Sequence, residues 1–468
     1  MKNLCFLIML VACACQSFKE QSPLNSLAEE VRESHLTDTS LFRNMRLTSL
    51  QSVKSFYALR DFSLFWSDGG NLSPAADSLL KIIDDANRFG LIPHDYHQEE
   101  LGKILGDSLL SDRLSRMDLL LTDGYLTLYR HLRYGRLDPQ TLQRSDLSLT
   151  SDAQAIASLE KIHTESMFRQ LSLMEPAGVQ YHQLKNALQS FRLMGKTDSL
   201  QRQRADKISL NMERWRWQKQ WPDRYVFVNI PAFSLRVIEK DSVWLKTKVI
   251  VGKRETPTPV LESVITSFII YPYWHVPFSI STKEILADLQ ADAAYLSRNN
   301  FEVLDRRGAL INSDTIRWKI YSKDFFPFIL RQREGTENSM GIIKFNFANN
   351  YGVYLHDTNS KRLFKRTERD LSHGCVRVDQ AVSFAHYLIR EDDIYVSPED
   401  LDQYLSLQQR LKIELRKPIA LKLAYFTSEV ENGTTFFYED IYKKDSLMMR
   451  ALYNPVETAP PFREKPSF

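Results

Sequence analysis

The sequence predicts an α+β protein, in which a helical N-terminal domain precedes a mainly β domain. Apolar residues recur at helical spacing up to about residue 200, which predicts helices. Short alternating β-branched runs broken by turn residues follow from Arg224 onward, which predicts strands. At 468 residues, 43% hydrophobic and 25% charged, the chain is long enough for two or three globular domains. The net charge of +3 contains no block of like charges, so no nucleic-acid partner is expected.

Residues 1–25 have the pattern of an export signal and a tether. Lys2 precedes the apolar run Leu4–Ala12, which is too short to span a bilayer but suits a signal peptide. Small residues before Cys13 resemble the lipobox of bacterial lipoproteins, whose cysteine carries the lipid. The alternative is an ordinary signal peptide cleaved near Ala14. We expect an exported, periplasmic lipoprotein that meets the membrane only through this anchor.

Residues 26–210 are expected to form a helical domain. "SLQSVKSFYALR" has apolar residues at helical spacing, and "SRMDLLLTDGYLTLYRHLRYG" repeats the pattern as far as Gly135. Between them, Ser73 is a candidate N-cap, Pro74 the first helical residue and Gly90 the stop signal. The aromatic pair "FW" before this helix is interpreted as core.

Residues 222–400 are expected to form the mainly β domain. Its predicted strands include "RYVFVNI", "SLRVIEK", "VWLKTKVIVG", "VITSFIIYPYWHVP", "IIKFNF", "YGVYLHDT" and "CVRV". A charged, partly helical insertion at residues 279–340 interrupts these strands. "AVSFAHYLIR" is predicted to be a helix that leads into the strand "DIYVSP". Residues 401–468 are expected to add a helix and a hairpin, made of "IALKLAYFTSEV" and "TTFFYEDIY" around the turn "ENG".

The motif "LSHGCVRV" contains Cys375, the only cysteine of the expected folded body. A single thiol excludes a disulfide framework or a metal site built on several cysteines. No metal-ligand spacing and no glycine-rich phosphate loop occurs elsewhere, so neither a metal nor a cofactor is expected. A lone cysteine is commonly a small buried apolar residue, and that interpretation stands beside a catalytic one.

His356 supplies the second half of a possible catalytic pair. It ends the predicted strand "GVYLH", 19 residues before Cys375, so two adjacent strands would bring both residues together. An imidazole that takes the thiol proton creates the nucleophilic thiolate. Gly374 allows a close approach of substrate to the backbone, where N–H groups could face a developing oxyanion.

The pattern of His356, fifteen residues and then Ser-His-Gly-Cys-Val-Arg resembles the signature of the L,D-transpeptidases, bacterial cysteine enzymes that cross-link peptidoglycan. The resemblance extends over most of residues 30–440 and includes "NMERWRWQ", "VIVGKRETPTPV", "YPYWHVPFSISTKEIL" and "GVYLHDT". It implies a helical scaffold domain, a catalytic domain and a substrate cap at 279–340. The interval at 178–210 is too short for the peptidoglycan-binding module of many large members, so we expect that module to be absent.

The resemblance implies that Cys375 attacks the carbonyl after the third residue of a tetrapeptide stem and releases the terminal D-alanine. An amine of a neighbouring stem then resolves the thioester into a 3→3 cross-link. His356 would be the base, oriented by the backbone carbonyl of Asp357. With water as acceptor the protein would be an L,D-carboxypeptidase, and with a lipoprotein lysine an anchoring enzyme. A non-catalytic wall-binding lipoprotein is the alternative from another class.

The remaining site candidates surround Cys375 in the sequence. His373 either lines the site or is structural, and Ser372 is expected to give hydrogen-bonding support. The N–H groups of Gly374 and Cys375 are the candidate oxyanion donors. Arg377, two residues after the thiol, either clamps a substrate carboxylate or forms a structural ion pair.

Two aromatic-flanked positions complete the candidates. Tyr354 is a possible substrate wall, because it lies two residues before His356. His275 is expected to pack beneath the cap, since it lies between Trp274 and Pro277. The oligomeric state is left open.

Overall fold

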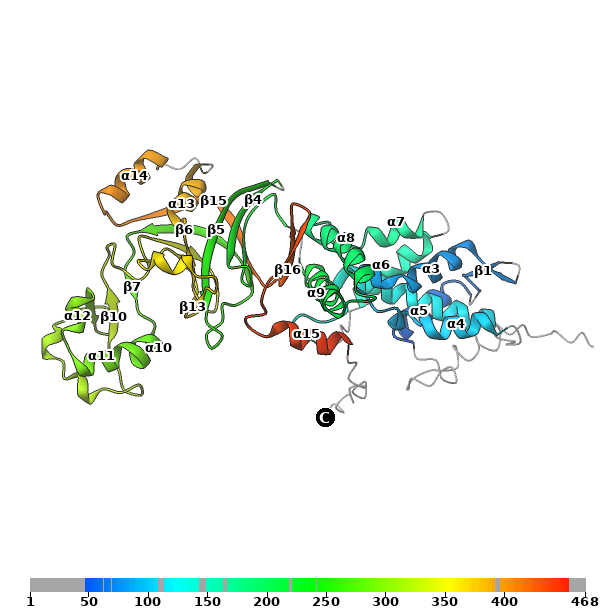
Figure 1. Ribbon diagram of the computed structural model, residues 1–468, viewed down its shortest axis with the longest axis horizontal. Coiled ribbons are helices and arrows are strands. Elements are labelled where there is room, and N and C mark those ends of the chain that lie inside the picture. Colours follow the sequence, from blue (N-terminus) through cyan, green and yellow to red (C-terminus); the bar gives the residue numbers. More distant parts are fainter. Residues whose placement is uncertain are drawn as a thin grey trace, which may run out of the picture. The chain divides into compact units, whose positions relative to one another are not determined.

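The computed structural model describes residues 47–453 except 62, 69, 108–112, 143–148, 163–165, 219–220, 241, 391 and 393–395. The predicted export signal, with Cys13, and the tether lie outside the described residues. The chain forms two compact units (Figure 1). The first takes residues up to Lys196 together with Trp215–Trp217, and the second takes Thr197–Arg214 and the residues from Gln218 onward.

The first unit is helical, as predicted. Its helices are α2 (Leu50–Ala58), α3 (Pro74–Asp84), α4 (Gln98–Gly106), α5 (Arg113–Tyr134), α6 (Leu149–Glu160), α7 (Met167–Ser172) and α8 (Val179–Met194), and a short hairpin joins β1 (Ser67–Asp68) to β2 (Asn71–Leu72). The predicted signals around α3 are confirmed. The Ser73 side chain accepts a hydrogen bond from the Ala76 N–H, Pro74 begins the helix, and Gly90 has a φ of 69° where the chain turns away.

A buried carboxylate on α5 organises the core of this unit. Asp118 accepts hydrogen bonds from the N–H groups of Phe65, at 3.0 Å, and Trp66, at 2.7 Å, and from the Tyr57 hydroxyl. The side chain of Thr122, one turn further along α5, bonds to the Tyr57 hydroxyl and the Trp66 indole. Phe65 and Trp66 are therefore core residues, as predicted, and burial raises the pKa of Asp118 to about 6.

The second unit contains α9 (Ser199–Arg216) as far as Arg214, and a nine-stranded sheet. The sheet has the order β13 (Asp370–Ser372), β5 (Ser242–Gly252), β14 (Val376–Val378), β12 (Leu355–His356), β11 (Ile343–Phe347), β6 (Leu261–Ile270), β15 (Leu411–Ala424), β3 (Arg224–Asn229) and β4 (Ser234–Glu239). Because β4 also pairs with β5, the sheet closes on itself. The mainly β character predicted for this part is confirmed.

The C-terminal segment differs from the predicted hairpin. The segment "IALKLA" ends the long strand β15, which pairs with β6 and β3 and so completes the sheet. The hairpin itself is shorter, with β16 (Ser428–Glu431) paired to β17 (Thr434–Phe437) around the predicted Asn-Gly turn. The alternation of apolar residues in β15 is the same for either pairing, so the sequence could not choose the partner strand.

The insertion between β6 and β11 is a small lobe with its own sheet. Its elements are β7 (Trp274–His275), α10 (Phe278–Ile280), α11 (Leu286–Ala291), α12 (Tyr295–Arg298), β8 (Phe301–Leu304), β9 (Leu310–Ile311) and β10 (Ile329–Gln332), with a π-helical turn at Ser281–Ile285. The strands have the order β7-β10-β8-β9 around a separate core that includes Trp318 and Leu330. We call this lobe, residues 274–340, the cap (Figure 1). Its helices were predicted, whereas its sheet was not.

Three helices complete the second unit. The predicted helix α13 (Ala381–Arg390) packs into the barrel core, where the Phe384 ring lies 4.5 Å from the Phe345 ring. Residues 393–395, the first half of the predicted strand "DIYVSP", lie outside the described residues, and Ser397 caps α14 (Pro398–Ser406). The last helix is α15 (Lys444–Tyr453). Among the described residues, no helix combines the length and apolar character needed to cross a bilayer.

We predict that Asp118→Ala destabilises the helical unit by about 3 kcal/mol, because it leaves two buried N–H groups without an acceptor. The carboxyl has a higher pKa in the folded unit than the ordinary 3.8, so its stabilisation is greatest below pH 3.8 and declines as the pH rises through about 6. Calorimetry of the full chain between pH 4 and 7 would show this decline in the wild type and its loss in the variant. Asp68→Ala, at an exposed site, should change the stability by less than about 0.5 kcal/mol.

Candidate active site

Two short parallel strands bring the predicted histidine and cysteine segments together. Leu355 and His356 of β12 pair with Val376 and Arg377 of β14, respectively. The Val376 N–H donates to the Tyr354 carbonyl at 3.0 Å, which sets Tyr354 beside Cys375. Alternate residues share a face of a sheet, and Leu355 and Val376 point into the core.

The opposite face therefore carries four of the predicted site residues: Tyr354, His356, Cys375 and Arg377. We call it the thiol face. The sequence had predicted that Arg377 and Cys375 share a face, and the register agrees with this. The Tyr354 and His356 rings lie 6.0 Å apart between centroids, nearly edge to face.

The loop that precedes Cys375 is held by hydrogen bonds on both sides. The Ser372 hydroxyl donates to the Cys375 carbonyl at 2.6 Å and accepts from the Gly374 N–H at 3.1 Å. Thr258 accepts from the Gly252 N–H and donates to the Gly374 carbonyl, both at 2.8 Å. Ser372 thus supports the loop, as predicted, and its oxygen is fully engaged there.

Two glycines make this loop possible. Gly374 has a φ of +112°, a conformation that other residues rarely adopt. Gly252 of β5 lies against it, and a Cβ at Gly252 would come within 3.0 Å of the Gly374 Cα and 2.1 Å of the Thr256 carbonyl oxygen. The close approach of β5 fixes the backbone that presents the thiol.

The two candidate oxyanion donors differ in availability. The Gly374 N–H already donates to Ser372, so this part of the prediction is not supported. The Cys375 N–H makes no hydrogen bond within the described parts of the chain. It is the donor that remains available for an oxyanion beside Cys375.

The thiol rests in an environment that favours its neutral form. Burial raises the pKa of Cys375 above its ordinary value of 9.0. The thiol pKa is lowered in turn by hydrogen bonding from the Tyr354 backbone, by the charges of Lys344 and Arg377, and by the Tyr354 side chain. The thiol is consequently protonated at neutral pH and needs a base before it can attack.

The imidazole of His356 is neutral and buried. Burial lowers its pKa to about 3, assisted by the charges of Arg377 and Lys344, while backbone hydrogen bonding at Asp357 and Met340 has the opposite effect. The Nδ1 atom of His356 is buried and makes no hydrogen bond in the described parts of the chain, so orientation of the ring by the Asp357 carbonyl stays a prediction. The Asp357 carboxylate accepts from the Ile342 N–H at 3.0 Å and pairs with Lys361, so it is engaged away from the imidazole.

Two cations flank the thiol without a carboxylate partner among the described residues. The Arg377 Nε is buried and makes no hydrogen bond there, so the structural ion pair considered for Arg377 is not present. Lys344 of β11 pairs with His356, and its Nζ lies 4.2 Å from the centroid of the Tyr354 ring. Sequence reasoning missed Lys344, because its relation to the thiol depends on β11 lying next to β12.

The other two histidines lie towards the cap. His373 Nε2 lies 2.6 Å from the Glu284 carboxylate of the cap, so this histidine joins the Cys375 loop to the cap. His275 is exposed on β7, opposite Arg331, and the prediction that it packs beneath the cap is wrong. Its neighbour Val276 fills that core position instead, because alternate strand residues face opposite sides.

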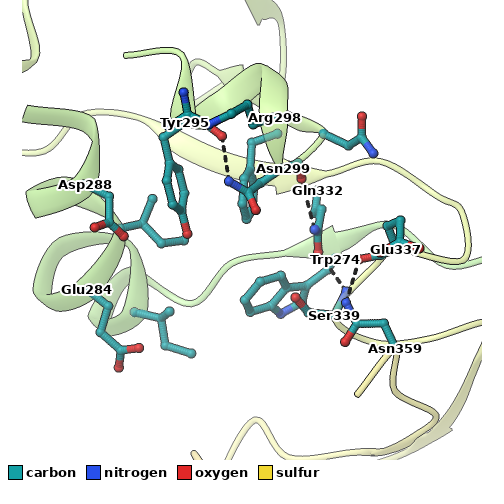
Figure 2. A pocket seen from close by; sticks show the side chains of 14 residues that line it. Trp274, Glu284, Asp288, Tyr295, Arg298, Asn299, Gln332, Glu337, Ser339 and Asn359 are labelled. Carbon is teal, nitrogen blue, oxygen red and sulfur yellow. Dashed lines mark hydrogen bonds between the residues drawn. The ribbon is translucent and has the colours of Figure 1, made fainter. Parts of the chain in front are cut away.

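The cap encloses a pocket of about 350 Å³ (Figure 2). Its lining includes three carboxylates, those of Glu284, Asp288 and Glu337, and the aromatic rings of Trp274 and Tyr295. Figure 2 shows Glu284 and Asp288 on one side of the pocket and Glu337 on the other.

Two contacts connect this pocket to the thiol face. Glu284 bonds to His373, and the side chain of Trp274 lies close to that of Tyr354, which lies close to Cys375. Among the described residues, no three His, Cys, Asp or Glu side chains are grouped as metal ligands.

Comparison with known proteins identifies both units. Residues 51–188 match a scaffold domain, and residues 223–396 match the L,D-transpeptidase catalytic domain. A Haemophilus influenzae protein named "Putative L,D-transpeptidase" is 29% identical over 410 residues, which cover 83% of this chain and 77% of that protein.

Solved structures with the same name show lower similarity. The NMR structure of the catalytic domain from E. faecium L,D-transpeptidase acylated by ertapenem is 12% identical, with a TM-score of 0.20, over 44% of this chain and 100% of that chain. The L,D-transpeptidase from Mycobacterium smegmatis is 14% identical, with a TM-score of 0.19, over 42% of this chain and 58% of that chain.

The family assignment rests on the two domain matches and the Haemophilus relative. Residues 223–396 are therefore an L,D-transpeptidase catalytic domain, and a scaffold domain at residues 51–188 precedes it.

Proposed function

We propose that this protein forms 3→3 cross-links between peptidoglycan stems through a thioester on Cys375. The observation that carries the proposal is the shared face of β12 and β14, where the thiol, a neutral imidazole and a free N–H lie together. Nucleophilic acyl transfer needs these three parts: a nucleophile, a base and an oxyanion donor.

The first half-reaction releases D-alanine. His356 takes the thiol proton, and the Cys375 sulfur attacks the carbonyl that follows the third residue of a tetrapeptide stem. The oxyanion meets the Cys375 N–H, and His356 then returns the proton to the leaving amine of D-alanine. The neutral state of His356 suits this role, because an imidazolium could not accept the proton.

The second half-reaction transfers the acyl group to an amine. His356 accepts a proton from the attacking amine, the amide bond forms, and the sulfur leaves as thiolate and is reprotonated. The unpaired cations Arg377 and Lys344 suit the carboxylates that peptide stems carry, and a substrate-clamping role for Arg377 remains part of this proposal.

The cap pocket supports an amine rather than water as the acceptor. Its three carboxylates and three aromatic rings are groups that attract an ammonium ion, and the one guanidinium of the lining, that of Arg298, is paired with Asp292. The pocket adjoins the thiol face through Glu284 and Trp274, so an amine held there would be close to the thioester. Cross-linking is therefore favoured over the L,D-carboxypeptidase alternative.

We also propose that the protein is exported to the periplasm and held there by a lipid on Cys13. The apolar run before Cys13 and the small residues next to it support this proposal. Cys13→Ser should abolish incorporation of radiolabelled palmitate and release the protein from the membrane fraction. Labelling that survives the substitution would exclude Cys13 as the anchor, and Cys15→Ser serves as the control.

We predict that Cys375→Ala loses all turnover of tetrapeptide muropeptides, because no other thiol lies in the described part of the chain. The wild type should release D-alanine and yield 3→3 dimers, which mass spectrometry can identify. Dimers formed by the variant would refute the mechanism. Tripeptide monomers alone would show hydrolysis, and a stem attached to a protein lysine would show anchoring.

We predict that Glu284→Gln combined with Asp288→Asn slows cross-linking about tenfold and raises the proportion of hydrolysed product. The reason is that the pocket loses two of the three carboxylates that would hold the amine. Asp314→Asn removes a carboxylate from the cap outside the pocket and should leave the product ratio unchanged. An unchanged ratio in the double variant would place the acceptor elsewhere.

A further inference from the structure

Lys344 lies on the strand next to the proposed base, on the same side of the sheet as Cys375. In β11, Ile343, Phe345 and Phe347 are buried in the barrel core, so Lys344 points to the opposite side. The sheet pairs Lys344 with His356 on one side and with Ile269 on the other. An ammonium group is thus fixed in the strand next to the proposed base.

The surroundings of this ammonium group contain a ring and a thiol but no carboxylate partner. The Nζ lies 4.2 Å from the centroid of the Tyr354 ring, and the pairing of β12 with β14 places Tyr354 beside Cys375. No ion pair to Lys344 occurs anywhere in the described ranges. Two other largely buried lysines do have one: Lys185 lies 2.6 Å from Glu175, and Lys422 lies 3.0 Å from Glu262.

Burying a cation without a partner anion costs free energy. A cation that is nevertheless buried in this way is therefore a candidate for a functional role. Burial lowers the pKa of Lys344 from 10.5, and the nearby Cys375 acts to raise it. The group near Lys344 that becomes an anion during the proposed reaction is the sulfur of Cys375.

We propose that Lys344 supplies the fixed positive charge that stabilises the thiolate of Cys375. The proton of the thiol moves to His356, and Lys344 keeps its own protons throughout. The imidazolium that forms is disfavoured in its buried position and loses its proton again to the leaving amine. The charge of Lys344 remains, so it also assists the sulfur when the acceptor amine expels it as thiolate.

Besides Lys344, the ionisable groups around Cys375 come from two neighbouring strands of the main sheet and from the side of the cap. His356 lies on β12, with Tyr354 directly before it, and Arg377 lies on β14, while His275 and the Glu284–His373 pair lie towards the cap. Arg377 is the second cation that lowers the thiol pKa, and Lys344 has the larger effect of the two. The tyrosine pKa is raised by burial and the His356 pKa is lowered, so neither titrates at neutral pH.

The test is the pH dependence of alkylation of Cys375 by iodoacetamide in the full-length protein. The reaction is followed by mass spectrometry of the tryptic peptide 370–377, which separates Cys375 from the cysteines near the N-terminus. Lys344→Met should raise the apparent thiol pKa by about one unit, so that alkylation at pH 7 slows about tenfold and the rates converge at high pH. Lys344→Arg should keep most of the wild-type rate, because it keeps the charge.

Lys422→Met is the matched control. Lys422 is also buried beneath a ring, with its Nζ 3.9 Å from the centroid of Trp221, but it has Glu262 as partner. It pairs with β6 seven residues away from Ile269, the partner of Lys344. This variant should leave the alkylation profile unchanged.

Two results would overturn the proposal: a Lys344→Met profile that superimposes on the wild type, or an equal shift in Lys422→Met. If Lys344→Met does not fold, Lys344→Gln replaces it, and equal profiles for Lys344→Gln and Lys344→Arg overturn the proposal. The inference rests on the proposed role of Cys375 as nucleophile, but alkylation needs no peptide substrate. Failure of the cross-linking assay and failure of the lysine effect are therefore separate outcomes.

Discussion

The parallel pairing of β12 with β14 is the constraint on which the site depends. It sets Tyr354 beside Cys375 and His356 beside Arg377, so that four polar side chains share one face. The same register sends Leu355 and Val376 into the core. A shift of one residue would bury the polar set and expose the apolar one, and hydrophobic burial therefore fixes the active-site register.

Burial also determines the charges on this face. The thiol and the imidazole are both kept neutral, because an ion is poorly solvated there. The charges of Arg377 and Lys344 lower the pKa of both groups. For the thiol they oppose the effect of burial, and for the imidazole they add to it. The site therefore rests without a preformed thiolate–imidazolium pair, and negative charge is stabilised where it develops during the reaction.

The sequence was sufficient to predict what depends on local pattern. The cap of α3 at Ser73, the helix α13 and the pairing of the Cys375 and His356 segments each follow from residues close together or from one motif. It was insufficient where a strand could choose between partners. The placement of β15 in the main sheet, the sheet of the cap and the position of Lys344 beside the thiol all depend on long-range pairing.

The contact between Gly252 and Gly374 has a consequence for substrate entry. With β5 on one side and the Ser372 and Thr258 hydrogen bonds on the other, the backbone that presents the sulfur has no room to shift. In the proposed reaction, a donor and an acceptor stem must nevertheless enter this site and the joined product must leave it in each cycle. The strand that presents the sulfur is then the fixed side of the site, whereas the cap, which packs around a core of its own, is the side that is free to differ.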